Sequence, residues 1–317
     1  MHIMILGAAG MLGQKLARAV DAGAIPGATR LTLIDRVQPE LVLGLPSVCE
    51  AIDLAEPGSV EDLAARAPDL VFHLAAVVSG QAEAEFEIGY LINLDLTRRL
   101  LEAFRVQATQ PRLVFSSSLA VYGPPFPDVV PDDFVLRPAS SYGVQKAMCE
   151  LLVSDYTRRG FINGTSVRLP TVSIRPGAPN AAASGFLSGI LREPLGGKSA
   201  ELPVDEATRV WIASPDVSVQ GLVYAASIEW ERIAPYPVLN LRGISVTVAE
   251  MLDALEAEAG AAARARVQRI DRPEVARIVQ SWPEAFTALS AEELGFPVNS
   301  GIAEIVHEYV SQFGKTS

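Results

Sequence analysis

Short apolar runs and amphipathic helical stretches alternate through the first half of this chain of 317 residues. The runs are continuously apolar, which indicates strands that are buried on both faces, as in a parallel sheet covered by helices. Strict alternation of such strands with helices predicts a doubly wound α/β fold. The predicted strands are His2–Leu6, Leu31–Asp35, Leu70–Leu74, Arg112–Ser116 and Thr165–Leu169, and the predicted helices are Met11–Asp21, Ser59–Arg66, Ile92–Val106 and Ser141–Arg159.

The pattern changes near residue 170, where we expect a smaller C-terminal lobe to begin. Residues 173–184 are rich in Pro, Gly, Ala and Ser, which predicts an extended loop. Val238–Leu241 predicts a strand that returns to the main sheet, and Thr247–Ala259 predicts a helix with Thr247 as its N-cap. The expected division is a first domain of residues 1–170, joined by that later strand, and a lobe that comprises mainly residues 171–317.

The chain is acidic, with a formal net charge of −11 at pH 7. An acidic surface argues against nucleic acid or an anionic membrane as a partner. It also means that an anionic substrate needs local cationic ligands, because the overall field repels it. At 49% hydrophobic residues, the chain can bury a sizeable core.

Cysteine and histidine usage predicts neither a disulfide framework nor a metal site. Cys49 and Cys149 form no CxxC pair, and the three histidines show no metal-ligand spacing. No apolar run approaches the length of a membrane span, and no basic stretch precedes the first strand. We therefore expect a cytoplasmic protein.

A glycine-rich turn follows the first predicted strand and opens the first predicted helix. Glycines at such a turn let backbone N–H groups approach a pyrophosphate, and the helix N-terminus supplies positive potential. The strand before it and the helix after it are the context that a dinucleotide-binding turn requires. The residues that we expect to bind the dinucleotide here are Gly7, Gly10, Met11, Leu12 and Gly13.

Acidic residues at strand ends predict which dinucleotide binds. Asp35 ends the second strand, where a carboxylate accepts hydrogen bonds from the ribose hydroxyls and repels a 2′-phosphate. NAD is therefore favoured over NADP, although Arg36 could instead bind a phosphate. Asp53, followed by Leu54, is a candidate acceptor for the adenine amino group.

Small residues follow the strand that ends near His73. Ala75 and Ala76 let the backbone pass close to a cofactor, so we include both in the predicted cofactor site. His73 itself is expected to be a packed or hydrogen-bonded structural residue.

Tyr142 and Lys146 lie four residues apart near the start of a predicted helix, so one helix face carries both side chains. A nearby ammonium favours a phenolate, and we expect it to lower the pKa of the tyrosine from its ordinary value of about 10. Tyr142 then becomes a usable general base for an alcohol proton, and Lys146 can also hold the nicotinamide ribose. The run Ser116–Ser118 upstream offers a hydroxyl that can orient the substrate oxygen.

Together these motifs resemble those of the extended short-chain dehydrogenases/reductases, the family of the nucleotide-sugar epimerases and dehydratases. The resemblance spans nearly the whole chain and implies a Rossmann domain with a smaller substrate-binding lobe. It implies that Ser118 is the catalytic hydroxyl, with Ser117 as the second choice. It also implies that Asn93 stabilises the active site and that Pro170 lies beside the nicotinamide carboxamide. One departure is Leu6, where many members carry Thr.

The arginines of the C-terminal lobe point to an anionic substrate, because arginine binds carboxylates and phosphates in a bidentate fork. Arg175 and Arg209 are the candidate substrate ligands, with Asn180 helping Arg175. Arg168 and Arg192 are more typical of structural or surface positions. Ser79, just after the third strand, is a further candidate for substrate contact.

Residues 168–186 closely resemble the corresponding stretch of family members that use NAD to oxidise the C2 hydroxyl of a four-carbon sugar acid to the 2-oxo acid. The resemblance therefore implies a sugar-acid dehydrogenase. Because family members often dimerise through the helices near 92–106 and 141–159, it also implies a homodimer. A nucleotide-sugar 4-epimerase or dehydratase on the same scaffold is the main alternative. A non-catalytic NAD(H)-sensing protein is a remote alternative. Such proteins can lose the Tyr/Lys pair, whereas this chain has both Tyr142 and Lys146.

Overall fold

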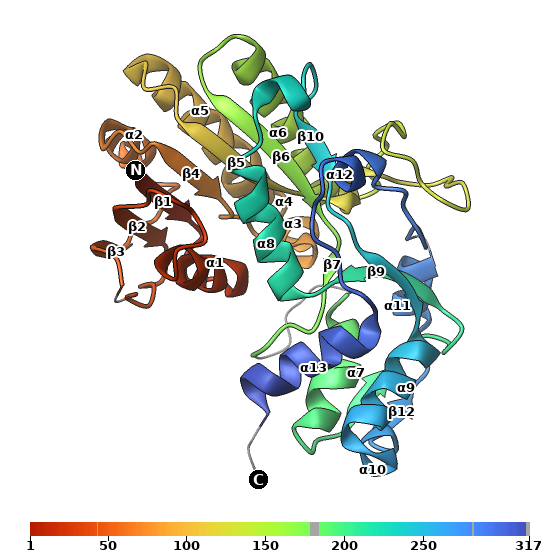
Figure 1. The fold of residues 1–317 in the computed structure, drawn as a ribbon. Coiled ribbons are helices and arrows are strands. Elements are labelled where there is room, and N and C mark those ends of the chain that lie inside the picture. Colours follow the sequence, from red (N-terminus) through yellow and green to blue (C-terminus); the bar gives the residue numbers. More distant parts are fainter. Residues whose placement is uncertain (43, 178–183, 281, 315–317) are drawn as a thin grey trace. The chain divides into compact units, whose positions relative to one another are not determined.

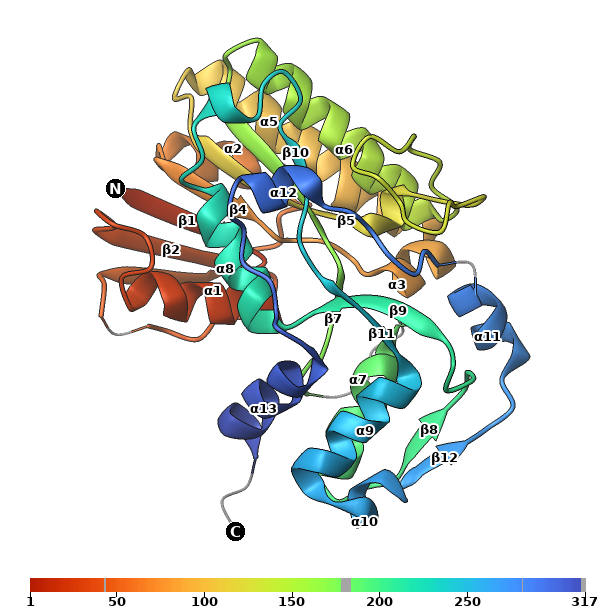
Figure 2. The ribbon, with the colours of Figure 1, turned by 45° about the vertical axis from the view of Figure 1, so that its right-hand side comes forward.

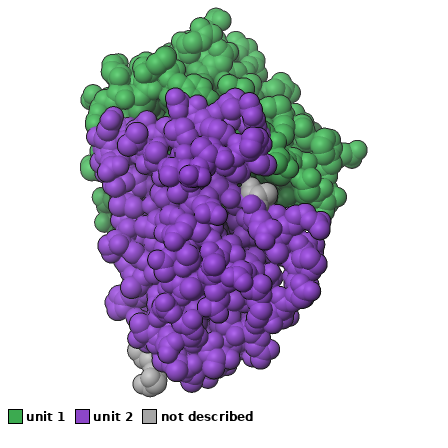
Figure 3. All heavy atoms as spheres, turned by 90° about the vertical axis from the view of Figure 1, so that its right-hand side faces the viewer, with its two compact units in different colours: residues 1–121, 138–169, 219–240 green, residues 122–137, 170–218, 241–317 purple. Residues whose placement is uncertain are grey.

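The computed structural model describes residues 1–317 except 43, 178–183, 281 and 315–317. The chain forms two compact units, which Figure 3 distinguishes by colour. Unit 1 comprises Met1–Val121, Pro138–Leu169 and Val219–Asn240, and unit 2 comprises Tyr122–Arg137, Pro170–Ser218 and Leu241–Ser317.

A seven-stranded parallel sheet forms the centre of unit 1, in the order β10-β6-β5-β4-β1-β2-β3. The predicted doubly wound fold is confirmed. The strand order reverses at β1, which has β2 on one side and β4 on the other, and ligands bind beyond the carboxyl ends of strands at such a reversal. The strands are β1 (His2–Leu6), β2 (Arg30–Asp35), β3 (Ser47–Ala51), β4 (Leu70–His73), β5 (Arg112–Ser118), β6 (Asn163–Leu169) and β10 (Val238–Asn240).

Helices cover both faces of this sheet. Figures 1 and 2 show α2, α5 and α6 on one face and α1 on the other, together with the part of α8 from Val219 onward. Side chains of α2, α5 and α6 pack with the strands into one apolar core. The helical elements of unit 1 are α1 (Met11–Asp21), α2 (Ser59–Ala65), α3 (Ser79–Ala84), α4 (Phe86–Gly89), the π-helix η1 (Tyr90–Asp95), α5 (Leu96–Gln107), the 3₁₀ turn η2 (Leu119–Val121), α6 (Ser141–Arg158) and the 3₁₀ turn η3 (Trp230–Arg232), and α8 (Pro215–Ala225) begins in unit 2.

Unit 2 contains two small sheets and its own apolar core. β9 lies between β11, to which it is antiparallel, and β7, to which it is parallel, while β8 and β12 form a parallel pair. Side chains of α7, α9 and α13 pack on these strands. The elements are β7 (Thr171–Val172), α7 (Gly185–Leu195), β8 (Ala200–Leu202), β9 (Arg209–Ala213), β11 (Ile244–Thr247), α9 (Val248–Ala259), α10 (Ala261–Arg264), β12 (Val267–Arg269), α11 (Pro273–Gln280), α12 (Leu289–Glu293) and α13 (Ile302–Phe313).

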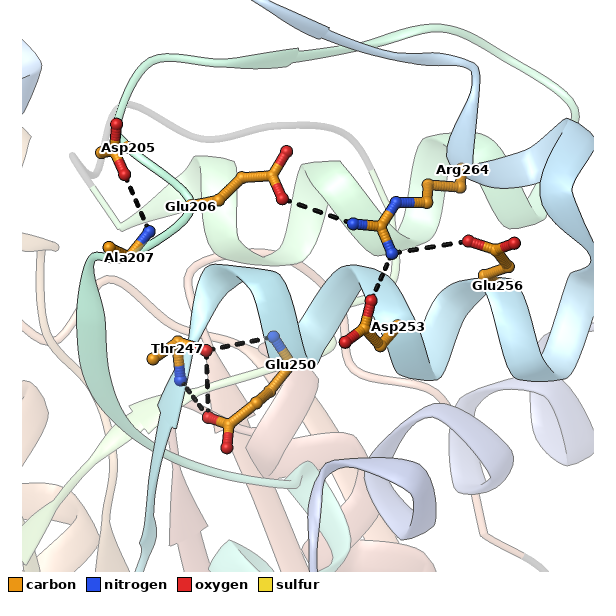
Figure 4. Close-up of polar contacts among 8 residues, drawn as sticks. All are labelled: Asp205, Glu206, Ala207, Thr247, Glu250, Asp253, Glu256 and Arg264. Carbon is orange, nitrogen blue, oxygen red and sulfur yellow. Dashed lines mark hydrogen bonds and ion pairs between the residues drawn. The ribbon is translucent and has the colours of Figure 1, made fainter.

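A capping box begins α9, as Figure 4 shows. The Thr247 hydroxyl accepts a hydrogen bond from the Glu250 N–H at 3.1 Å, and the Glu250 carboxylate accepts one from the Thr247 N–H at 2.6 Å. The prediction of Thr247 as the N-cap is confirmed. Arg264, the last residue of α10, pairs with Asp253 and Glu256 of α9 and, at 3.3 Å, with Glu206. These exposed pairs join α9 and α10 to the turn before β9, and each contributes little to stability.

One segment of unit 1 ends at Leu169 and unit 2 resumes at Pro170, and the predicted division into residues 1–170 and mainly 171–317 stays a prediction. The two units also exchange segments, because residues 122–137 belong to unit 2 and Val219–Asn240 belongs to unit 1. The predicted strand Val238–Leu241 corresponds to β10, which pairs in parallel with β6 of the main sheet. Among the described residues, no helix is long and apolar enough to cross a membrane, and no cluster of His, Cys, Asp or Glu has the arrangement of a metal site.

Candidate active site

The glycine-rich turn joins the end of β1 to the start of α1. Gly7 has a φ of +88°, a left-handed conformation that favours glycine. A Cβ atom on Gly7 would lie 2.6 Å from the backbone nitrogen of Ala75, and one on Gly13 would lie 2.2 Å from the carbonyl oxygen of Gly7. The turn, the first turn of α1 and the backbone after β4 therefore pack at distances that require glycine.

The N-terminus of α1 fits a pyrophosphate. Within the described chain, no side chain caps this helix at Gly10, and no acidic residue lies in its first turn. The N–H groups of Met11, Leu12 and Gly13 therefore begin the helix without a capping side chain from the described residues or an acidic residue in its first turn, and the helix dipole adds positive potential there.

Asp35 lies at the end of β2, and its carboxylate faces the glycine turn. Oδ2 accepts a hydrogen bond from the Ala9 N–H at 3.0 Å, and Oδ1 accepts one from the Val37 N–H at 3.3 Å. These two bonds fix the carboxylate beside the turn. Arg36, the next residue, is exposed.

The other predicted cofactor residues of unit 1 follow β3 and β4. The Asp53 carboxylate accepts a hydrogen bond from the Ala55 N–H at 2.9 Å, which holds a local turn, and Leu54 is buried in the apolar core. Ala75 and Ala76 come directly after the end of β4, and Ser79 is the first residue of α3.

Ser118, Tyr142 and Lys146 come together in unit 1, from the end of β5 and the first turns of α6. The Ser118 side chain lies beside the Tyr142 phenol, and the Ser118 hydroxyl accepts a hydrogen bond from the Ala120 N–H at 3.1 Å. The Lys146 Nζ donates to the carbonyl of Ser116 at 2.8 Å and lies 5.6 Å from the centroid of the Tyr142 ring.

Close packing fixes α6 against the end of β5. A Cβ atom on Gly143 would lie 2.1 Å from the Ala120 carbonyl oxygen, so the helix approaches η2 more closely than any other residue type would allow. The Ser140 side chain caps α6 by accepting a hydrogen bond from the Gly143 N–H at 3.2 Å. Tyr142 is therefore held on the first turn of a capped helix.

The pKa values of the tyrosine and the lysine shift because Lys146 is buried and Tyr142 is half-buried among protein atoms. Burial raises the pKa of Tyr142 to about 12, against the lowering effect of its hydrogen bond with Ser118. Burial lowers the pKa of Lys146 to about 8, against the raising effects of Cys149 and Glu150. The prediction that the pKa of Tyr142 falls below its ordinary value is wrong. The ammonium donates to Ser116 and lies over the Phe115 ring, and desolvation of the phenol dominates.

Asn93 lies in the π-helix η1, a distortion that is frequent at functional sites. Its Oδ1 accepts a hydrogen bond from the Val77 N–H at 2.9 Å, and its Nδ2 donates to the Gln145 Oε1 at 2.8 Å. Asn93 thus joins the segment after β4 to the helix that carries Tyr142 and Lys146. Gln145 was not predicted, and its only sequence signal is its place directly before Lys146.

His73 is a packed structural residue, as predicted. Its Nε2 and the Thr97 hydroxyl lie 2.9 Å apart in a hydrogen bond, and the side chain is fully buried. Burial, with a smaller effect of the Lys146 charge, lowers its pKa to about 3, so it is neutral at the pH of most enzyme assays.

Arg175 and Arg192 lie close together in unit 2. Arg175 donates to the Ser184 hydroxyl at 3.1 Å, and Arg192 donates to the Arg175 carbonyl at 2.9 Å. Burial, and then the charge of Arg192, lower the pKa of Arg175, which is the signature of a cation short of counter-charge. Asn180, the predicted helper of Arg175, lies outside the described residues.

The remaining predicted residues have structural contacts of their own. Arg209 donates to the Ser245 carbonyl at 3.2 Å, and its guanidinium lies 3.8 Å from the Glu250 carboxylate. Pro170 is buried and lies in the chain directly after β6 and before β7. Arg168 forms a buried ion pair with Glu150, which agrees with its expected structural role.

Comparison with known proteins gives a family match over most of the chain and relatives that are similar over nearly its full length. The family described as "NAD dependent epimerase/dehydratase family" matches residues 3–228. The chain is 46% identical to a D-erythronate dehydrogenase of Cupriavidus necator, over 99% of both proteins. It is 40% identical to a D-erythronate dehydrogenase of Haemophilus influenzae, over 98% of this chain and 99% of the relative.

Among solved structures, one described as the nucleoside-diphosphate-sugar epimerase from Agrobacterium tumefaciens is similar to the chain with a TM-score of 0.96. The two are 46% identical, and the match covers 100% of this chain and 95% of the other. The descriptions of these similar proteins thus name both of the activities between which the sequence left a choice.

Proposed function

Because the chain belongs to the NAD dependent epimerase/dehydratase family, we propose that it is an NAD-dependent dehydrogenase that oxidises the C2 hydroxyl of D-erythronate to the 2-oxo acid. The observation that carries the proposal is that Ser118, at the end of β5, lies beside Tyr142, with Lys146 one turn along the helix that carries Tyr142. Two relatives named D-erythronate dehydrogenase, similar over nearly their whole length, support the choice of substrate.

Bound NAD would supply the hydride acceptor. The residues that would hold it are the N–H groups at the start of α1 for the pyrophosphate and Asp35 for the adenosine ribose, where the carboxylate disfavours a 2′-phosphate. Asp53, Leu54, Ala75 and Ala76 are proposed neighbours of the cofactor at the adjacent strand ends.

Tyr142 is the proposed base that takes the proton of the C2 hydroxyl. Ser118 donates a hydrogen bond to the same substrate oxygen and so orients it. Lys146 keeps its proton below a pH of about 8 and supplies positive charge beside the phenol, which opposes the cost of forming a phenolate in a buried site. C2 then loses its hydride, and the carbon–oxygen bond becomes a carbonyl.

Arg175 is the proposed ligand of the substrate carboxylate, because its guanidinium is partly buried and lacks a carboxylate partner among the described residues. Arg209 and Ser79 are secondary candidates. A cytoplasmic location is proposed on the ground that Cys49 and Cys149 are both free thiols. A homodimer through α5 and α6 stays a prediction from the family resemblance.

Substitution of Tyr142 by Phe tests the mechanism. Tyr142→Phe should abolish turnover, because no group then accepts the hydroxyl proton, and should leave NAD binding nearly intact. Tyr156→Phe is the matched control on the same helix, since the Tyr156 hydroxyl bonds to Glu102 and not to the catalytic groups. The measurements are NADH formation with D-erythronate and NAD affinity by calorimetry. Retained turnover in Tyr142→Phe would refute the assignment.

A nucleotide-sugar 4-epimerase is the second candidate, favoured by the description of the similar Agrobacterium tumefaciens structure. An epimerase of this kind returns the hydride to its substrate, so it gives no net NADH. NADH accumulation with D-erythronate but not with UDP-glucose supports the dehydrogenase. Conversion of UDP-glucose without NADH accumulation supports the epimerase.

A further inference from the structure

A buried carboxylate lies directly behind the catalytic residues of unit 1. Glu150 is fully buried on α6, one helical turn after Lys146. Its Oε1 accepts a hydrogen bond from the Arg168 Nε at 2.9 Å and its Oε2 accepts one from another Arg168 nitrogen at 2.7 Å. The Ser117 hydroxyl donates to Oε1 as well. Both carboxylate oxygens are thus engaged by charged or hydroxyl donors.

Glu150 and its two partners, Ser117 and Arg168, come from α6, β5 and β6. Ser117 directly precedes Ser118 at the end of β5, and Arg168 pairs with Ser117 in register on β6. Arg168 also reaches Asn240 on β10 at 3.4 Å. One carboxylate therefore links the strand that ends in the catalytic serine to the helix that presents Tyr142 and Lys146.

We propose that Glu150 is a positioning residue for catalysis, which fixes α6 against the serine end of β5 and keeps a negative charge one turn from Lys146. The inference rests on the proposed dehydrogenase function. It does not require Glu150 to contact substrate or cofactor. A buried ion pair costs desolvation energy that an apolar pair would avoid, so stability alone is weak reason for its presence. Because Glu150 lies between Ser117 and Lys146, we infer that the ion pair serves catalysis.

The charge of Glu150 acts on Lys146 in a defined direction. Burial lowers the pKa of Lys146 to about 8, and Glu150 is among the groups that oppose this lowering. Removal of that negative charge should therefore let the lysine lose its proton at lower pH. The titratable or charged groups around Lys146 are Tyr142, Cys149 and Glu150 on α6 and His73 at the end of β4, with Arg168 on β6 behind Glu150.

The test is the pH profile of turnover for Glu150→Gln. Glutamine keeps the volume and an oxygen acceptor for Ser117 and Arg168 but removes the charge. We expect kcat to fall about tenfold. The alkaline limb of the profile should move down by about one pH unit, because the charge that is removed lies one helical turn from Lys146. NAD affinity should be little changed. Asp155→Asn is the matched control, because Asp155 pairs with Arg158 on the exposed side of the same helix.

Glu150→Gln leaves the charge of Arg168 buried without its partner and can fail to fold for that reason. The double variant Glu150→Gln/Arg168→Met removes both charges, and the alkaline limb should move down in it too. An alkaline limb that stays at the wild-type position in every folded variant overturns the proposal, whether or not kcat falls. If the wild type itself shows no Tyr142-dependent oxidation of D-erythronate, the proposed function has failed instead.

Discussion

Gly13→Ala tests whether the close packing of α1 on the glycine turn creates the proposed pyrophosphate site. The new Cβ would lie 2.2 Å from the Gly7 carbonyl oxygen and 2.8 Å from the Ala8 Cα atom. Contacts below 3.4 Å are already tighter than most Cβ contacts, so the backbones must separate by about 1.2 Å, the difference between 3.4 and 2.2 Å. Both neighbours are backbone atoms, and no side-chain rotation can relieve the clash.

The expected cost is the balance of two effects. Overpacking of this kind costs about 1–3 kcal/mol, and the absence of a movable side chain places Gly13→Ala at the upper end. The better helix propensity of alanine returns about 1 kcal/mol. A net loss of about 2 kcal/mol in the free energy of unfolding should lower the melting temperature by several degrees. The displaced N–H groups should also weaken NAD binding by about tenfold to a hundredfold, or about 1.4–2.7 kcal/mol.

Gly189→Ala provides the matched control, because Gly189 also lies inside a helix but a Cβ atom added there would meet no neighbouring heavy atom within 4 Å. That variant should be as stable as the wild type or slightly more stable, with unchanged NAD affinity. The measurements are thermal unfolding and calorimetric titration with NAD. Wild-type NAD affinity in Gly13→Ala would refute the argument that this packing shapes the site.

Two further predictions concern the cofactor and the acid stability of the fold. Asp35→Ser should raise the ratio of kcat/KM with NADP to that with NAD, because it removes the carboxylate that repels a 2′-phosphate; an unchanged ratio would contradict the role of Asp35. His73, with a pKa of about 3 in the fold against an ordinary 6.5, binds its proton more readily when unfolded, so its contribution to stability is present above pH 6.5 and is lost as the pH falls toward 3. Between pH 7.5 and pH 5 this loss should be about 2 kcal/mol. Urea unfolding at both pH values should show a correspondingly smaller loss for His73→Gln, and equal losses would exclude His73 as a source of acid sensitivity.

The sequence predicted those features that depend on local pattern. A buried strand, a glycine turn and a helix are contiguous in the chain, so the start of the molecule could be interpreted without knowledge of the rest. The Tyr142 and Lys146 pair was predicted because helical spacing alone puts both on one face. The predicted strands omit β3, because Ser47–Ala51 is an edge strand with little apolar character.

Other features depend on burial or on a small change in helical geometry. The sign of the pKa shift of Tyr142 was predicted wrongly, because a charge four residues away is visible in a sequence and the desolvation of a phenol is not. The predicted single helix Ile92–Val106 is a π-helix, Tyr90–Asp95, followed by α5. A π-turn and an α-turn share nearly the same apolar pattern, so periodicity does not separate them.

Contacts between residues distant in sequence determine the geometry of the catalytic group. Asn93 and Gln145 are 52 residues apart, Ser117 and Glu150 are 33 apart, and Glu150 and Arg168 are 18 apart. These bonds connect to residues adjacent to Ser118 and to the Tyr142 helix, whereas the Tyr/Lys spacing is fixed within one helix. A chain could therefore retain the motif and still hold its hydroxyl, phenol and ammonium in an unproductive arrangement. It follows that substitutions of Gln145 and Glu150 should impair turnover although the Tyr/Lys motif itself is unchanged.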